Sequence, residues 1–322
     1  MSDSFNHFHY LDQKLVAEAP NDVVSFNWQE FIQVRKSQFT NFQFVVSKGK
    51  EILYSEIKDE VKSGEFGIYI LLEKPTNLYW IKLHDFFTTS NDLLYLNTNN
   101  IVVHEDIGLQ KSIHNMQVIS HGHNEYYYLN KQLHSQLFLN SIHFELTQHL
   151  KFFSIQLNNN QKQKNSFHYL LESGSKLDLK SLSCIKEGQI LDDSIECTHG
   201  SQSESNIQYE SLTAGKITTQ VNSIIGYFAK DCKTSQNLKH IALNKNVTIN
   251  SKPNLMIENP NVVASHGSST GSFSEHDLFY LGQRGLNKQQ SINVLSQSKI
   301  SKFISETSLE KELSKYIGIY ND

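Results

Sequence analysis

The 322-residue chain is poor in cysteine and has no long apolar run, and each shortage excludes a class of protein. Its 3 cysteines form no Cys-x-x-Cys pair, which argues against a disulfide framework, a structural zinc site and a ferredoxin-type motif. No stretch approaches the about 18 apolar residues of a membrane span, and the first residues lack the basic and apolar segments of a secretory signal. We therefore expect a cytoplasmic protein that makes no membrane contact.

Basic charge and nucleotide motifs are also missing. A net charge of −4 gives no basic excess, so nucleic acid is not an expected partner. Neither a phosphate-binding loop ending in Gly-Lys-Ser/Thr nor a Gly-x-Gly-x-x-Gly fingerprint occurs. Ser265 beside His266 superficially suggests a hydrolase, but adjacent residues cannot easily aim a hydroxyl at the ring. The sequence thus gives no support to a nucleotide-binding loop and little to a hydrolase.

What the chain does contain, over residues 76–262, is a run of short segments rich in β-branched and aromatic residues. Clusters of Asn, Gly, Ser and Asp separate them, and no helical period lies between them, which argues against βαβ units. The run indicates a sandwich, a barrel or a β-solenoid. Its unbroken length and the Asn-rich corners, such as Asn158–Asn160, favour the solenoid, although no strict repeat separates it from a sandwich. The predicted strands are Asn100–Val103, Met116–Ile119, Glu125–Leu129, Ile142–Leu146, Phe152–Leu157, Phe167–Leu171, Leu177–Leu182, Ile207–Leu212, Lys216–Val221 and Ile224–Phe228.

Residues 1–75 have mixed patterns and predict a small N-terminal α/β region. A short helix is expected over Trp28–Arg35, and strands over Phe42–Val46 and Gly67–Leu72.

Residues 263–322 change to helical patterns. A first helix is expected after Ser274 as far as Arg284, with Gly285 as its stop. A second begins at Asn287, with Gln290 as its capping-box partner. A third has an apolar stripe of Leu309, Leu313, Tyr316 and Ile317. These helices form either a cap over the end of a solenoid or a docking surface for a partner.

One Cys–His pair, one His–His pair and the two other cysteines are the candidates for chemistry. Cys197 and His199 share one strand face, and thiolate with imidazole suits zinc, copper or iron, but a structural role is favoured for so common a motif. His121 and His123 have the same spacing and are expected at a turn. Of the other cysteines, Cys184 is expected in the core and Cys232 at an exposed strand–turn junction.

Four motifs in the last third of the chain occur in a specific order. They are Ser251-Lys252-Pro253, Ser265-His266-Gly267 with Thr270-Gly271, the aromatic segment Asp277–Leu281, and Gln283-Arg284-Gly285-Leu286. Together they resemble the C-terminal half of SufD, of the SufB/SufD family of iron–sulfur cluster assembly scaffolds. The resemblance is strong over 233–304, extends weakly back to Cys197, and is absent from the first 180 residues.

The resemblance implies a right-handed parallel β-helix with an N-terminal region and a C-terminal helical domain, which favours the solenoid. It implies a SufB-like partner at the end of the β-helix and a SufC-like ATPase docked on the C-terminal helices. The SufC-like partner would hydrolyse ATP, so the resemblance implies that this chain is not itself an enzyme. An iron–sulfur cluster would be held transiently and shared with SufB, and the resemblance leaves a flavin in the complex open. The residues expected to contact SufC are Phe279, Tyr280, Arg284, Ile292, Leu295 and Phe303.

One residue takes a role from the resemblance. His266 matches the family histidine implicated in cluster formation at the SufB–SufD interface, where it would ligate iron; the alternative is a histidine that caps a turn. The family often has cysteine where this chain has Ala264, and Gln236–His240 lacks the catalytic cysteine of SufB, which favours SufD.

A stand-alone, metal-binding homodimer remains an alternative. A polysaccharide-cleaving β-helix enzyme is disfavoured, because the acidic residues are scattered.

Overall fold

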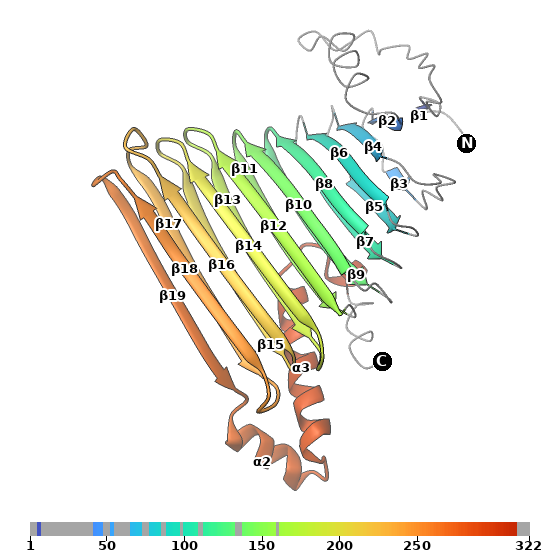
Figure 1. The fold of residues 1–322 in the computed structure, drawn as a ribbon, viewed down its shortest axis with the longest axis vertical. Coiled ribbons are helices and arrows are strands. Elements are labelled where there is room, and N and C mark those ends of the chain that lie inside the picture. Colours follow the sequence, from blue (N-terminus) through green and yellow to red (C-terminus); the bar gives the residue numbers. More distant parts are fainter. Residues whose placement is uncertain are drawn as a thin grey trace.

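The computed structural model describes residues 5–7, 41–47, 52–54, 65–72, 77–84, 88–96, 99–108, 112–132, 137–158 and 161–313. Over these residues the chain winds into a parallel β-solenoid with two long sheets (Figure 1). From β2 onward, consecutive strands alternate between the sheets, so each of these strands pairs with the strand two places away in the sequence. The predicted β-helix is therefore confirmed.

The ten-stranded sheet begins at β1 and ends at β18. In spatial order it contains β1 (Phe5–His7), β2 (Asn41–Ser47), β4 (Glu65–Leu72), β6 (Thr88–Leu96), β8 (Ser112–Ser120), β10 (Leu137–Leu146), β12 (Lys162–Leu171), β14 (Ile190–His199), β16 (Lys216–Ile225) and β18 (Thr248–Ile257). Its pairs are parallel except for β1 with β2.

The nine-stranded sheet ends at β19 and lies opposite. From that end it contains β19 (Val262–Ser272), β17 (Cys232–Ala242), β15 (Glu204–Thr213), β13 (Lys176–Ile185), β11 (His149–Asn158), β9 (His123–Gln132), β7 (Ile101–Gly108), β5 (Asn77–His84) and β3 (Ile52–Tyr54).

Side chains alternate between the interior of the solenoid and its outside, as the twofold period of a strand requires. In β14 every second residue is buried, from Leu191 to His199. Equivalent residues of successive turns stack, as in the Phe144–Tyr169 pair, whose ring centroids lie 4.8 Å apart. The aromatic side chains of this interior core are Tyr126, Tyr128, Phe144, Phe152, Phe167, Tyr169 and Tyr209.

The solenoid extends past both boundaries expected from the sequence. Strands β2, β3 and β4 already belong to the two sheets, so the described part of residues 1–75 is not a separate α/β region. The helix expected over Trp28–Arg35 lies outside the described residues. At the other end β19 continues to Ser272, past the boundary at residue 263 where the C-terminal helical domain was expected to begin.

Two strand predictions also need correction. Lys216–Val221 and Ile224–Phe228 were expected as separate strands, but β16 runs unbroken to Ile225 and a turn at Tyr227 and Phe228 follows it. Polar β14 was not predicted as a strand, because its Asp and Glu residues conceal the alternation.

Three helices follow the last strand: α2 (Glu275–Gln283), α3 (Lys288–Ser305) and α4 (Glu310–Leu313). The predicted capping box is present, because Asn287 and Gln290 each accept from the other's backbone N–H. Gly285 has a φ of +88°, as a glycine that ends a helix often does. Tyr316 and Ile317 of the predicted third helix lie outside the described residues. No described helix is both long and apolar enough to cross a membrane.

Helix α3 lies along the outer face of the nine-stranded sheet rather than over the end of the solenoid (Figure 1). Its Ile300 and Ile304 pack on an apolar strip that crosses several strands, so α3 does not form the end cap that was one of the two alternatives. The strip, here called the lateral strip, consists of Val103, Tyr127, Leu129, Phe153, Ile155, Leu157, Leu182, Cys184, Leu212 and Ile241.

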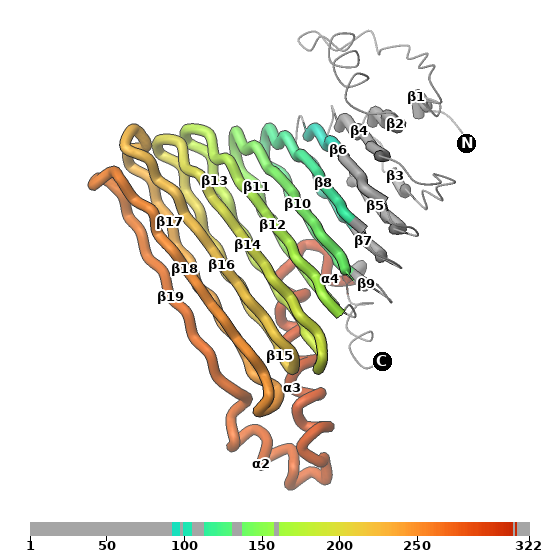
Figure 2. Tube along the Cα trace, in the orientation of Figure 1, coloured from blue at the N-terminus to red at the C-terminus, as the bar shows by residue number. Residues whose placement is uncertain are grey.

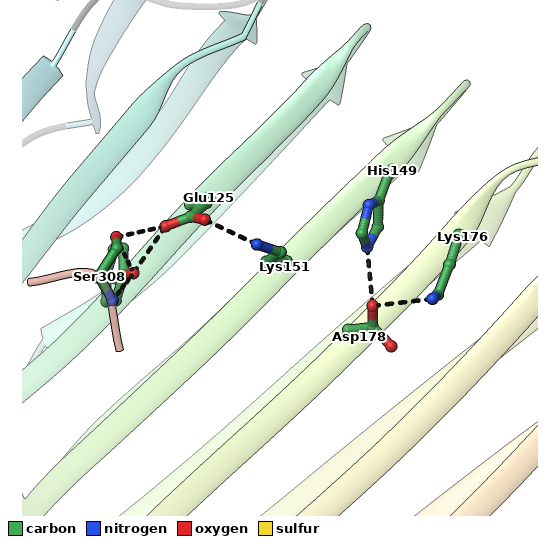
Figure 3. Close-up of polar contacts among 7 residues, drawn as sticks. Glu125, His149, Lys151, Lys176, Asp178 and Ser308 are labelled. Atoms are coloured by element: carbon green, nitrogen blue, oxygen red, sulfur yellow. Dashed lines mark hydrogen bonds and ion pairs between the residues drawn. The ribbon is translucent and has the colours of Figure 1, made fainter. Parts of the chain in front are cut away.

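Polar contacts fasten the end of this helical segment to the same face (Figure 3). Ser308 Oγ donates to Glu125 Oε2 at 2.6 Å, and Lys151 Nζ donates to Glu125 Oε1 at 3.0 Å. The backbone N–H of Ser308 donates to the Tyr127 hydroxyl. Farther along the sheet, Asp178 pairs with His149 at 2.8 Å. The contacts of Ser308 hold the segment between α3 and α4 against the sheet.

Candidate functional site at the open end

The last turn of the solenoid, formed by β18 and β19, is open among the described residues (Figure 2). Each of its strands pairs on one side only, β18 with β16 and β19 with β17. An unpaired strand edge is a template for another chain. This end is therefore a candidate interaction site.

His266 lies in the middle of β19 and faces the interior side of the open turn. Its register partner on β17 is Gln236, whose side chain is buried inside the solenoid. Because paired residues of a sheet point the same way, His266 occupies the equivalent interior position, but no further turn covers it and it is exposed. The Ser265-His266-Gly267 motif was expected in a turn and is part of a strand instead.

A column of hydrogen bonds centred on His240 connects the closed interior to the open turn. His240 Nδ1 bonds to Ser211 Oγ at 2.8 Å, and Nε2 bonds to Ser251 Oγ of β18 at 3.0 Å. Ser268 Oγ of β19 donates to the same Ser251 Oγ at 2.8 Å. Burial lowers the pKa of His240 to about 4, so the imidazole is neutral at neutral pH.

A second column is centred on Gln236. Its Nε2 donates to Ser223 Oγ at 2.8 Å and to the backbone carbonyl oxygen of Asn254 at 3.0 Å. Its Oε1 is buried and has no hydrogen-bond partner. Both columns tie β18 to the rest of the solenoid.

The structure gives little support to the Cys197–His199 pair as a metal site. Burial raises the pKa of the Cys197 thiol well above its usual range and lowers that of His199 to about 4. Both ring nitrogens of His199 are occupied, by Ser203 Oγ at 2.8 Å and Ser205 Oγ at 3.0 Å. Across the described part of the chain, no group of three or more His, Cys, Asp or Glu residues could hold a metal ion.

The three cysteines are free and buried. Cys184 lies in the lateral strip beneath α3, and burial raises its pKa to about 12. Cys232 was expected to be exposed, but it begins β17 with its side chain inside, where its thiol donates to the carbonyl of Gly200 at 3.1 Å. None of these thiols lies on the open turn.

His121 and His123 flank a corner, as expected, with Gly122 at a φ of +82° between them. They point to different neighbours: His121 Nδ1 bonds to Thr147 Oγ1 at 2.9 Å, whereas His123 stacks edge-on against His149.

The helical residues expected at a partner interface divide into two groups. Phe279 and Tyr280 of α2 are 67% and 51% exposed, and the Arg284 guanidinium lies 4.8 Å above the Tyr280 ring. Ile292 of α3 is buried. Leu295 and Phe303 are partly buried, and Phe303 packs against the lateral strip. Of the two groups, only the α2 group has all its members exposed to solvent.

These features define a parallel β-solenoid with one open, histidine-bearing end and a helix packed along its side. Residues 94–299 match the family described as SUF system FeS cluster assembly, SufBD core domain. Because this match covers more than half of the chain, the protein belongs to that family.

Curated relatives agree with the family. The chain is 32% identical over 81 residues to an iron-sulfur cluster assembly SufBD family protein of Mycobacterium leprae, covering 25% of this chain and 21% of that one. It is 23% identical over 113 residues to the SufBD family protein ycf24 of Porphyra purpurea, covering 34% and 23%. It is also 31% identical over 94 residues to protein ABCI7, chloroplastic, of Arabidopsis thaliana, covering 29% and 19%. The matched stretches thus span about a fifth of each relative.

Proposed function

We propose that this protein is a SufD-like scaffold subunit for iron–sulfur cluster assembly. It works with a SufB-like subunit at its open end and a SufC-like ATPase at its helices, and it catalyses no reaction itself. The observation that carries the proposal is the position of His266, an exposed imidazole on the interior side of an uncovered turn.

The chemistry of this end is incomplete in one chain. An imidazole nitrogen is a suitable ligand for iron, but iron–sulfur clusters are held mainly by thiolates. All three cysteines are buried, and none lies on β18 or β19. The thiolate must therefore come from a partner that covers the open turn. The absence of cysteine from Gln236–His240 supports a SufD-like rather than a SufB-like role.

The proposed ATPase contact uses α2. Phe279 and Tyr280 expose large aromatic surfaces on a helix that has no buried residue. Exposed aromatic side chains beside an arginine are typical of the residues that dominate protein–protein binding energy.

The test is co-expression with SufB-like and SufC-like proteins from the same genome, followed by affinity purification and native mass determination. We expect a complex with one SufB-like and about two SufC-like subunits, as the family resemblance implies. Phe279→Ala with Tyr280→Ala should remove the SufC-like subunit and leave the SufB-like subunit bound. Exposed Val294→Ala on α3 is the matched control. Retention of the ATPase by the double variant would reject the α2 contact.

His266→Ala should leave the complex intact and slow cluster formation, measured by cluster absorbance after supply of iron and sulfide. Wild-type assembly by the variant complex would mean that His266 is structural. The same absorbance spectra test whether the complex binds a flavin.

A stand-alone homodimer is the second candidate, because the open edge of one chain can pair with the same edge of a second copy. Native mass separates the two: a dimer of this chain that ignores both partners would favour the homodimer.

A further inference from the structure

We infer that Gln236 is a positioning residue for His266: the exposed His266 ring turns one N–H towards the unpaired side-chain oxygen of Gln236, which leaves the lone pair of the other ring nitrogen free for a metal ligand. This inference rests on the proposed role of His266. It concerns the last two strands of the nine-stranded sheet, where the two residues are register partners.

The orientation of the Gln236 amide follows from its contacts. A backbone carbonyl oxygen only accepts hydrogen bonds, so the group that faces the Asn254 carbonyl at 3.0 Å must be the amide nitrogen. The second N–H of that nitrogen is directed to Ser223 Oγ at 2.8 Å. Both donors are therefore used, and a flip of the amide would place its oxygen against the Asn254 carbonyl oxygen, which cannot donate.

This orientation leaves Oε1 as a buried acceptor with no partner, although Gln236 is only 2% exposed. A buried polar atom without a hydrogen bond costs about 1–3 kcal/mol, so such atoms normally have a donor nearby. The next residue on the same face, one strand farther out, is His266. In the structure its exposed ring makes no hydrogen bond to Oε1, but it carries the N–H donor that Oε1 lacks.

Elsewhere in this solenoid, histidines interact with their register partners in the same way. His240 bonds to Ser211, its partner on β15, at 2.8 Å. His168 Nδ1 lies 3.6 Å from Glu196 Oε1, on its partner in β14. A hydrogen bond between His266 on β19 and Gln236 on β17 would repeat the arrangement of His240 on β17 and Ser211 on β15, one strand farther along the sheet.

The consequence is chemical. A neutral imidazole has one N–H and one lone pair, and the hydrogen bond made by the N–H decides which nitrogen is the ligand. Partners of this kind orient metal-binding histidines, and their loss typically lowers metal affinity or activity by about 10–100-fold. Gln236 would thus fix both the tautomer and the direction of His266 before a partner arrives.

The experiment is long-range ¹H–¹⁵N NMR of the ring nitrogens in the full chain, with the His266 signals assigned by their loss in His266→Gln. We expect wild-type His266 to populate one predominant tautomer, and Gln236→Met, which keeps the length but removes the acceptor, to give a mixture. Asn237→Met is the matched control, because the next residue faces outward, and it should leave the tautomer unchanged.

A mixed tautomer in the wild type would overturn the inference, and that measurement does not depend on whether Gln236→Met folds. An unchanged tautomer in folded Gln236→Met would overturn it as well. In the assembly assay, Gln236→Met should slow cluster formation about tenfold. If His266→Ala assembles clusters normally while wild-type His266 populates one tautomer, the proposed function of His266 is rejected. The hydrogen bond between His266 and Gln236 is then still supported.

Discussion

The closed turns and the last turn of the solenoid share one alternating pattern but have opposite surroundings. Leu179 of β13 points into the interior and is 1% exposed, whereas Leu255 occupies the same kind of position on β18 and is only partly buried. The difference is the presence of a following turn, not the residue type. Interior residues of an uncovered turn are thus available to whatever binds there.

The largest expected effect compares these two leucines. Leu179→Ala should lower the free energy of unfolding by about 2–5 kcal/mol, because it removes a fully packed side chain. Leu255→Ala should cost less than about 1 kcal/mol in the isolated chain, because its side chain already contacts solvent. Chemical denaturation of both variants measures the difference. Equal losses would show that the last turn is as well packed as the others.

A smaller effect on stability is expected at His240, whose hydrogen bonds link a closed turn of the solenoid to the open last turn. Its pKa is about 4 when folded and about 6.5 when unfolded, so the unfolded chain binds the proton first as the pH falls. Stability from this residue should be complete above pH 6.5 and decline by up to about 3 kcal/mol towards pH 4. The difference in unfolding free energy between wild type and His240→Gln, measured from pH 7 to 4, should show this decline.

Exposed His276→Gln is the control for His240, since its side chain is 88% exposed. The wild type and this variant both retain His240, so the decline due to His240 cancels in their difference. Buried Asp193 acts with the opposite sign, because burial raises its pKa to about 6. Both variants retain Asp193, so its contribution cancels in each difference.

The smallest expected effect on stability concerns the contact between α3 and the side of the solenoid. Ile304→Val should cost about 1 kcal/mol, because it removes one methyl group from the contact between α3 and the lateral strip. Val294→Ala, on the exposed side of the same helix, should change stability by less than about 0.5 kcal/mol. Thermal unfolding of the pair tests the packing of α3. A loss for Val294→Ala as large as that for Ile304→Val would contradict it.

The sequence predicted the type of fold, since short β-branched segments without helical periods left few architectures, and the family motifs favoured the solenoid. It placed α2 and the start of α3 well, because Ser274, Asn287 and Gly285 are strong local signals. It missed β14, whose interior positions include Asp193. That carboxylate is tolerated because Asn165, Gln156 and Tyr209 donate hydrogen bonds to it.

The candidate site was only partly predictable. His266 came from the resemblance, but its strand conformation and its partner Gln236 did not, because the pairing depends on the length of one solenoid turn. Without that length, residues 236 and 266 have no visible relation. The division between exposed Phe279 and buried Ile292 also required the structure, since both helices carry apolar residues.

The contact between Tyr127 and Ser308 joins residues 181 positions apart. During translation the strands that carry the lateral strip leave the ribosome long before α3 does, and domains fold in that order. The nascent solenoid would therefore present an apolar face until its own helix arrives. A chaperone that binds apolar surface would find its target in this interval, and slowing synthesis before residue 288 would prolong it.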